Sequence, residues 1–196
     1  GGVNYYTGQL FDIPAIAAAA RAQGIVVGLD LAHAVGNVRL SLHDWDIDFA
    51  AWCSYKYLNG GPGAVGGIFV HERHGLQYDG PRLLGWWGHE PNSRFAMPPD
   101  FRPMPGAEGW QNSNPPILSM TPLRASLPLF QQAGWDALEA KSRLLTGLLR
   151  QNLLAVEGLN LRILTPEEQS GCQLSVYVPE QGRKLFDHLA ELGIVA

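Results

Sequence analysis

Two apolar runs, each leading to a side chain that carries charge, constrain the fold of this chain more than any other feature. The run 24–29 leads directly into Asp30, and the run 49–53 leads to Lys56. Such runs are typical of buried strands in α/β sheets, where ligands bind at the carboxyl ends of the strands. We therefore expect Asp30 and Lys56 to lie at the same edge of one sheet.

An aspartate and a lysine placed in this way suit the chemistry of pyridoxal phosphate. A lysine binds this cofactor as a Schiff base, and an aspartate keeps its pyridine nitrogen protonated so that the ring accepts electrons. Either residue alone would more often be an ordinary strand-end side chain, because isolated motifs have low specificity. The combination of Asp30 and Lys56 favours a cofactor site.

His33 and Tyr55 are further candidates because they flank these two residues in sequence. His33 either packs at the turn after the strand or supports the cofactor through its phosphate or through Asp30, and its neighbours favour the second role. Tyr55 would face away from Lys56 on a regular strand. At a strand end that alternation breaks down, and its hydroxyl could reach a phosphate or donate a proton.

The segment 80–116 is rich in Pro, Gly and Trp and has no clear periodicity, which is typical of a long functional or interfacial loop. Trp86 either packs in a core or interface, or donates its indole N–H to a phosphate. Asn114 is a natural helix cap before two prolines, and it could equally bind a polar group of a substrate.

Two other patterns resemble known motifs and are better explained otherwise. Residues 61–66 match G-x-G-x-x-G, but the dinucleotide fingerprint needs a helix after the loop, and here a β-rich segment follows. The glycines more plausibly allow a tight turn beside a bulky cofactor. His71 and His74 are one residue short of the H-E-x-x-H spacing of zinc proteases, so we expect a solvated turn and no metal site.

Composition excludes several classes of function. The 196 residues carry a net charge of −4 and no basic stripe, so nucleic acid and anionic lipid are not expected partners. No stretch approaches the ~20 apolar residues of a membrane helix. Cys53 and Cys172 lie far apart and are expected to be thiols in a reducing compartment, which predicts a cytoplasmic protein.

The elements expected along the chain give a mostly parallel α/β part followed by a smaller α+β part, with the change of domain near residue 115. An initial strand at 1–6, a helix capped by Asp12 and closed by Gly24, and the strand ending at Asp30 would form a βαβ unit. A long helix is expected over 136–154, a strand over 172–178 and a helix over 182–192. Both ends fall at expected strands, which favours a fragment of a longer polypeptide.

Five blocks of this sequence resemble kynureninases, and the likeness runs over essentially the whole chain. The block at 52–59 is the most specific. The blocks are DLAHAVGN at 30–37, LHDW at 42–45, WCSYKYLN at 52–59, GWWGHE at 85–90 and SNPPI at 113–117.

This resemblance implies a fold-type-I pyridoxal-phosphate enzyme of tryptophan catabolism. Kynureninases split L-kynurenine, and its 3-hydroxy form, into anthranilate or 3-hydroxyanthranilate and L-alanine, and they act as homodimers with shared active sites. By the same resemblance, residues 1–115 would be the later part of the cofactor-binding large domain, and 116–196 most of the small domain. Members of the family are about twice this length, so the isolated chain would lack parts of the site and turn over little substrate.

The resemblance also assigns roles to the candidate residues. Lys56 would be the Schiff-base lysine, Asp30 the partner of the pyridine nitrogen, and His33 a residue that holds the cofactor. Tyr55 would hold the cofactor and donate a proton.

Trp86 and Asn114 would complete the site. The resemblance implies that Trp86 contacts the cofactor phosphate. Asn114 would approach the aromatic end of the substrate in the neighbouring subunit's site.

Two alternatives remain open at this point. Another fold-type-I lyase, of the cysteine desulfurase type, would share the Asp, His and Lys arrangement, but it normally needs a mobile catalytic cysteine. Cys53 lies in an expected strand and Cys172 in the distal domain, so neither is well placed. The other alternative is a non-catalytic fragment that only associates with a partner chain.

Overall fold

A computed structural model describes residues 1–75 and 80–196 of the chain. These residues form two compact units, each described here by itself. The first consists of Gly1–Gly2 and Asp12–Trp135, and the second of Val3–Phe11 and Asp136–Ala196. The units therefore change at residues 135–136, whereas the sequence analysis placed a change of domain near residue 115. The assignment of 1–115 and 116–196 to a large and a small domain stays a prediction.

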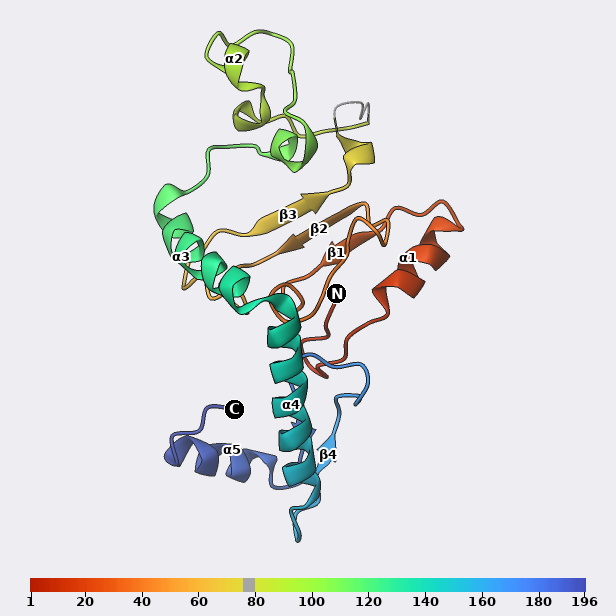
Figure 1. Ribbon diagram of the computed structural model, residues 1–196, viewed down its shortest axis with the longest axis vertical. Coiled ribbons are helices and arrows are strands. Elements are labelled where there is room, and N and C mark those ends of the chain that lie inside the picture. Colours follow the sequence, from red (N-terminus) through yellow and green to blue (C-terminus); the bar gives the residue numbers. More distant parts are fainter. Residues whose placement is uncertain (76–79) are drawn as a thin grey trace. The chain divides into compact units, whose positions relative to one another are not determined.

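The first unit is built on a three-stranded sheet (Figure 1). Its strands are β1 (Gly28–Asp30), β2 (Phe49–Trp52) and β3 (Gly67–Val70), in that order. β1 and β2 run parallel, and β3 is antiparallel to β2. Leu29 is paired with Ala50, and both side chains are buried. The two apolar runs of the sequence are thus neighbouring strands of one sheet, as expected.

Helix α1 (Ile13–Arg21) confirms the predicted caps. The Asp12 carboxylate accepts a hydrogen bond from the backbone N–H of Ala15 at 3.0 Å, which satisfies one of the free donors of the first turn. Gly24 has φ +66°, a left-handed conformation that glycine adopts without a steric penalty. Ile13 and Ala17 of this helix are buried and belong to the core of the first unit.

The strand expected at residues 1–6 was a wrong prediction. In the first unit, Gly2 donates one hydrogen bond from its backbone N–H to the carbonyl of Asp30, but no strand forms there. A Cβ added at Gly2 would lie 2.7 Å from a methyl carbon of Leu31, so the backbone runs close to the core at this point. The parallel pair of the sheet is therefore β1 with β2, joined by residues 31–48.

The remainder of the first unit follows β3. Its described residues form the short 3₁₀ helices η1 (Glu72–His74), η2 (Trp86–Gly88) and η3 (Gly106–Trp110), and the α-helices α2 (Pro91–Arg94) and α3 (Ile117–Ala133). The sequence analysis did not predict α3. Its interior holds Pro122 and Pro128, which remove backbone donors and normally break a helix.

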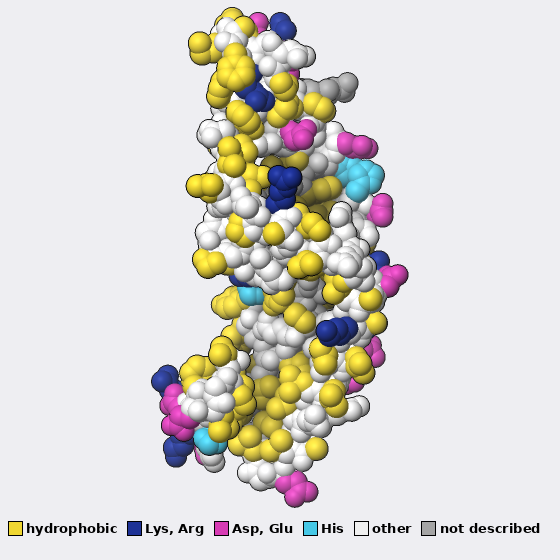
Figure 2. Space-filling view, turned by 60° about the vertical axis from the view of Figure 1, so that its left-hand side comes forward, with side chains coloured by type: hydrophobic (Ala, Val, Ile, Leu, Met, Phe, Trp, Pro, Cys, Tyr) yellow, Lys and Arg dark blue, Asp and Glu magenta, His cyan; other side chains and the backbone are white. Residues whose placement is uncertain are grey.

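The second unit contains α4 (Trp135–Leu154), the antiparallel pair β4 (Arg162–Ile163) and β5 (Val176–Tyr177), and α5 (Gly182–Glu191). Both helices confirm the predictions, whereas the strand expected over 172–178 is reduced to two residues. Figure 2 shows hydrophobic side chains gathered on this unit beside the charged side chains of α5. The exposed large hydrophobic side chains of α4 include Leu144, Leu145, Leu148 and Leu149.

None of the helices within residues 1–75 and 80–196 has the length and apolar character needed to cross a bilayer.

Candidate functional site

The ends of β1 and β2 bring Asp30 and Lys56 to the same edge of the sheet. Asp30 is paired with Ala51 in the parallel register, and the backbone N–H of Leu31 donates to the Ala51 carbonyl at 2.8 Å. The Asp30 carboxylate is exposed and accepts a hydrogen bond from the N–H of Ala32 at 2.9 Å. The carboxyl ends of the two strands therefore lie side by side. Asp30 ends β1, and the turn that carries Lys56 follows β2.

The strongest contact at this edge joins Lys56 to His33. Lys56 Nζ lies 3.0 Å from His33 Nε2, although the two residues are 23 positions apart. Burial, and then the positive charge of Lys56, lower the pKa of His33, while Asp30 acts in the opposite direction. A neutral imidazole can accept a hydrogen bond from the ammonium group, so this contact fixes the direction of the Lys56 side chain.

Tyr55 stands beside Lys56 and is 53% exposed, so its ring is open to solvent. A hydrogen bond with the Cys53 side chain, followed by the electrostatic effect of Cys53, raises the pKa of Tyr55. A tyrosine phenol is protonated near neutral pH in any case, as a proton donor must be, and the shift makes this phenol a weaker acid. Cys53 was not among the predicted site residues. The signal that could have found it is its position at the end of the apolar run 49–53, two residues before Tyr55.

The turn that carries Lys56 is closed by backbone and hydroxyl hydrogen bonds. Gly60 N–H donates to the carbonyl of Ser54 at 2.8 Å, and Asn59 N–H donates to the carbonyl of Lys56 at 3.2 Å. The buried Ser54 hydroxyl donates to the carbonyl of Val65 at 2.6 Å, across the glycine-rich loop. That loop leads into β3 and not into a helix, so the argument against a dinucleotide fingerprint is confirmed.

Trp86 and Asn114 have local partners within the segment 86–114. The Trp86 indole N–H donates to the backbone carbonyl of Arg94 at 3.1 Å, and the ring is 47% exposed. Asn114 is exposed, and its side-chain oxygen accepts a hydrogen bond from the Ser113 hydroxyl at 3.3 Å. The prediction that Asn114 caps the following helix is wrong, because α3 begins after Pro116 with no side-chain cap.

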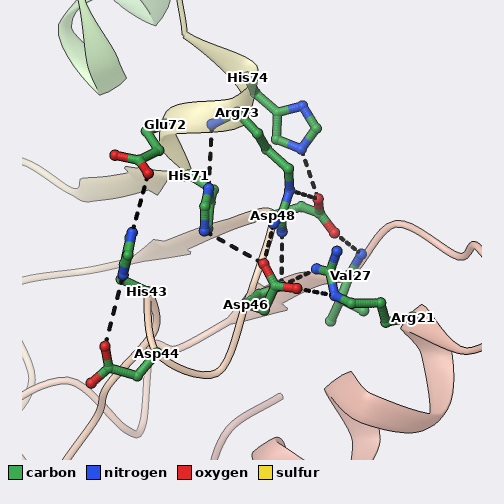
Figure 3. A network of polar contacts seen from close by, with 10 residues as sticks. All are labelled: Arg21, Val27, His43, Asp44, Asp46, Asp48, His71, Glu72, Arg73 and His74. Carbon is green, nitrogen blue, oxygen red and sulfur yellow. Dashed lines mark hydrogen bonds and ion pairs between the residues drawn. The ribbon is translucent and has the colours of Figure 1, made fainter.

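At the opposite ends of β1 and β2, a charged network replaces the predicted solvated turn (Figure 3). Asp48 directly precedes β2 and has a side-chain exposure of 6%. Its carboxylate accepts hydrogen bonds from the N–H of Val27 at 2.7 Å, Arg73 Nε at 2.8 Å and His74 Nε2 at 2.7 Å. Burial acts to raise the pKa of Asp48, but these three hydrogen bonds outweigh it and lower the pKa to about 2.

Asp46 and His71 extend this network towards the surface. Asp46 forms ion pairs with Arg21 of α1 and with Arg73 (Figure 3), and the hydrogen bond from Arg73 lowers its pKa. His71 is buried, lies 3.5 Å from Asp46 and stacks on His43 with ring centroids 4.8 Å apart. Within the described residues, no group of three or more His, Cys, Asp and Glu side chains could hold a metal ion. The network is thus a set of ion pairs that ties α1 and η1 to the start of β2.

This chain is similar to a family model, to curated relatives and to solved structures. The class-V aminotransferase family model matches residues 2–194. A kynureninase from Xanthomonas oryzae pv. oryzae is 59% identical over 199 residues, which cover 99% of this chain and 47% of that protein. The chain therefore spans about half the length of the curated relatives it matches.

Solved structures with lower identity show the same fold. A cysteine desulfurase from Thermococcus onnurineus matches with a TM-score of 0.77 at 18% identity, over 98% of this chain and 47% of that one. A C-DES variant with glycine covalently linked to its PLP cofactor matches with a TM-score of 0.77 at 21% identity, over 99% of this chain and 50% of that one. The predicted fold class, part of a fold-type-I α/β transferase, is thereby confirmed.

Proposed function

Because this chain belongs to the class-V aminotransferase family, we propose that it carries the lysine-bearing part of an enzyme that uses pyridoxal phosphate to hydrolyse L-kynurenine. The products would be anthranilate and L-alanine, with 3-hydroxyanthranilate formed from the 3-hydroxy substrate. The observation that carries the proposal is the 59% identity with a kynureninase over 99% of this chain.

The residues at the carboxyl ends of β1 and β2 fit this cofactor. Asp30 presents an exposed carboxylate, and Lys56 presents an amine that is held by His33 at 3.0 Å. These are the groups that a pyridinium nitrogen and an aldehyde carbon require. Lys56 would attach to the aldehyde carbon, Asp30 would bind the ring N–H, and His33 would hold the cofactor together with Tyr55.

The chemistry can then be divided between the cofactor and the protein. When bound, pyridoxal phosphate acts as an electron sink that makes bonds at the amino-acid carbons labile. Lys56, once released, would remove the Cα proton of the substrate as a general base. Asp30 would keep the ring nitrogen protonated throughout. Tyr55, whose phenol is protonated near neutral pH, would donate the proton that completes L-alanine.

Trp86 and Asn114 are the remaining residues of the proposed site. For Trp86 to bind the cofactor phosphate, its indole N–H would exchange the carbonyl of Arg94 for a phosphate oxygen. Asn114 would meet the aromatic end of the substrate in the neighbouring subunit of a homodimer. Large exposed apolar side chains in this part of the chain support such an association, namely Leu83, Phe95, Met97, Ile117 and Leu118.

The competing function is that of a cysteine desulfurase. Desulfurases match this chain at 18–23% identity, which supports a shared fold and no more. Cys53 is half-buried next to the end of β2, and its thiol donates to the backbone carbonyl of Ala32 at 3.9 Å, so it does not lie on a mobile loop as a desulfurase cysteine does. The reducing, cytoplasmic location expected from the sequence is compatible with either activity.

The proposal is tested with the complete gene product, purified with pyridoxal phosphate and supplied with L-kynurenine or L-cysteine. We expect anthranilate fluorescence to rise with L-kynurenine and no sulfide to form from L-cysteine. Sulfide without anthranilate would replace the proposed function with the desulfurase alternative. If neither anthranilate nor sulfide forms, the chain belongs to a fold-type-I protein that acts on another substrate or only associates with a partner.

A further inference from the structure

We propose that Ser126 of α3 is a positioning residue for Lys56, and that it acts through the carbonyl of Leu58. Its hydroxyl donates a hydrogen bond of 2.7 Å to that carbonyl, across 68 positions of sequence. The inference rests on the proposed function, because it concerns the lysine that would bind the cofactor. It adds a residue of α3, which lies outside the sheet edge.

The burial of Ser126 distinguishes it from the rest of its helix. Within α3, all of whose residues the structure describes, Ser126 is the one buried side chain, with 7% of its surface exposed. A buried hydroxyl without a partner would cost free energy, so its hydrogen bond to the turn is part of the packing. The buried Ser126 hydroxyl therefore depends on the turn that carries Lys56 for its hydrogen-bond partner.

Other hydroxyl groups of α3 behave differently. Ser119 donates to the carbonyl of Pro116 at 3.0 Å, and Thr121 donates to the carbonyl of Ile117 at 3.3 Å. Both are local bonds to the preceding turn, which is the common use of a hydroxyl in or beside a helix. Ser126 instead reaches a carbonyl of the loop between β2 and β3.

The bond from Ser126 completes the restraint of a turn that is already fixed at its base. Gly60 N–H binds the carbonyl of Ser54, so residues 54–60 form a closed loop with Lys56 near its middle. Gly36 backs this loop closely, because a Cβ at Gly36 would lie 2.9 Å from the carbonyl carbon and oxygen of Tyr57. Ser126 therefore holds the carbonyl two residues after Lys56, from the side of α3.

This restraint has a direct consequence for the amine. Lys56 Nζ meets His33 Nε2 at 3.0 Å, and this contact forms only while the Lys56 backbone stays within reach of the four-carbon side chain. If the Leu58 carbonyl is released, the turn gains freedom and the amine spends less time against His33. The cofactor would then bind a lysine that is less well placed for it.

The test compares Ser126→Ala with Ser119→Ala, the same substitution on the same helix without a bond to the turn. Two quantities are measured on the complete gene product: the dissociation constant for pyridoxal phosphate, and the pKa of His33 in the cofactor-free protein by NMR. For Ser126→Ala we expect the dissociation constant to rise about three- to tenfold. We also expect the pKa of His33 to move up towards its ordinary value, because Lys56 and burial lower it and Asp30 alone opposes them.

Ser119→Ala should change neither quantity. Ser126→Cys keeps the shape of the side chain and offers only a weak donor, so it should give intermediate values and serves if Ser126→Ala does not fold. The inference is overturned if the Ser126 variants unfold at a lower temperature yet keep the wild-type pKa of His33 and the wild-type cofactor affinity. If the wild type itself takes up no pyridoxal phosphate, the proposed function fails, and the pKa of His33 still decides the role of Ser126.

Discussion

The two ends of the parallel pair β1 and β2 differ in how their polar groups are used. At the amino ends, Asp48 is buried and binds a backbone N–H, an arginine and a histidine. At the carboxyl ends, Asp30 and Tyr55 are exposed, and Lys56 Nζ contacts His33 Nε2 at 3.0 Å. The first arrangement stabilises the fold, whereas the second leaves donors and acceptors open to a ligand, as is usual at the carboxyl edge of α/β sheets.

The comparison predicts that a substitution at the carboxyl ends should change cofactor binding, and that a substitution at the amino ends should change the stability of the fold. The largest expected effect is that of Lys56→Ala, which removes the amine that would attach to the cofactor. We expect loss of the borohydride-trappable lysine adduct of pyridoxal phosphate and of all kynurenine turnover, with an unchanged melting temperature of the cofactor-free protein. Lys141→Ala, which removes an exposed lysine of α4, should retain both. A borohydride-trappable adduct retained in Lys56→Ala would contradict the assignment.

Asp48→Asn should have the largest effect on stability. The amide keeps the shape of the side chain but no longer balances the charge of Arg73, so we expect the free energy of unfolding to fall by about 3 kcal/mol. Urea unfolding measures this directly. Asp44→Asn is the control, because Asp44 lies in the same connection with its side chain 81% exposed. A variant that keeps wild-type stability but loses cofactor would reverse the proposed division between the two ends.

Asp30→Asn should reduce turnover by about 100-fold, which corresponds to about 2.7 kcal/mol in the activation barrier. The amide no longer keeps the ring nitrogen of the cofactor protonated, so the electron sink is weakened. The rate of anthranilate release from L-kynurenine gives the effect, and urea unfolding should show no change. Near-normal turnover would remove Asp30 from the proposed mechanism.

The smallest effect is an acid dependence of stability at the amino ends. The pKa of Asp48 is lowered to about 2 from an ordinary value near 3.8, so its contribution is full above about pH 4. It is lost as the pH falls through 2, and it amounts to about 2 kcal/mol. The difference in unfolding free energy between wild type and Asp48→Asn should therefore shrink as the pH falls from 4 towards 2. A difference that stays constant over this range would mean that Asp48 is not the group that titrates.

The sequence predicted the carboxyl edge better than the amino edge. Asp30 and Lys56 each follow an apolar run, and the period and length of such runs indicate buried strands. The network around Asp48 could not be predicted in this way. Arg73 and His74 are 25 and 26 positions away from their partner, and only the antiparallel pairing of β3 with β2 brings them to it.

Two other differences have local physical causes. Helix α3 was missed because Pro122 and Pro128 lie in its interior and because Ser126 is its one buried residue among those described, so the sequence shows no apolar stripe. The strand expected at residues 1–6 does not form, since Gly2 donates only one backbone hydrogen bond to the sheet, at Asp30. Hydrophobic pattern alone does not distinguish such a segment from a strand.

The most direct test of the central claim is to find which lysine binds the cofactor. The complete gene product is incubated with pyridoxal phosphate, reduced with borohydride, digested, and searched for modified lysines by mass spectrometry. We predict one dominant pyridoxyl group, on Lys56 at the end of β2. A dominant label on another lysine, such as Lys141 or Lys184, with Lys56 unmodified, would contradict the assignment of the carboxyl edge as the cofactor site.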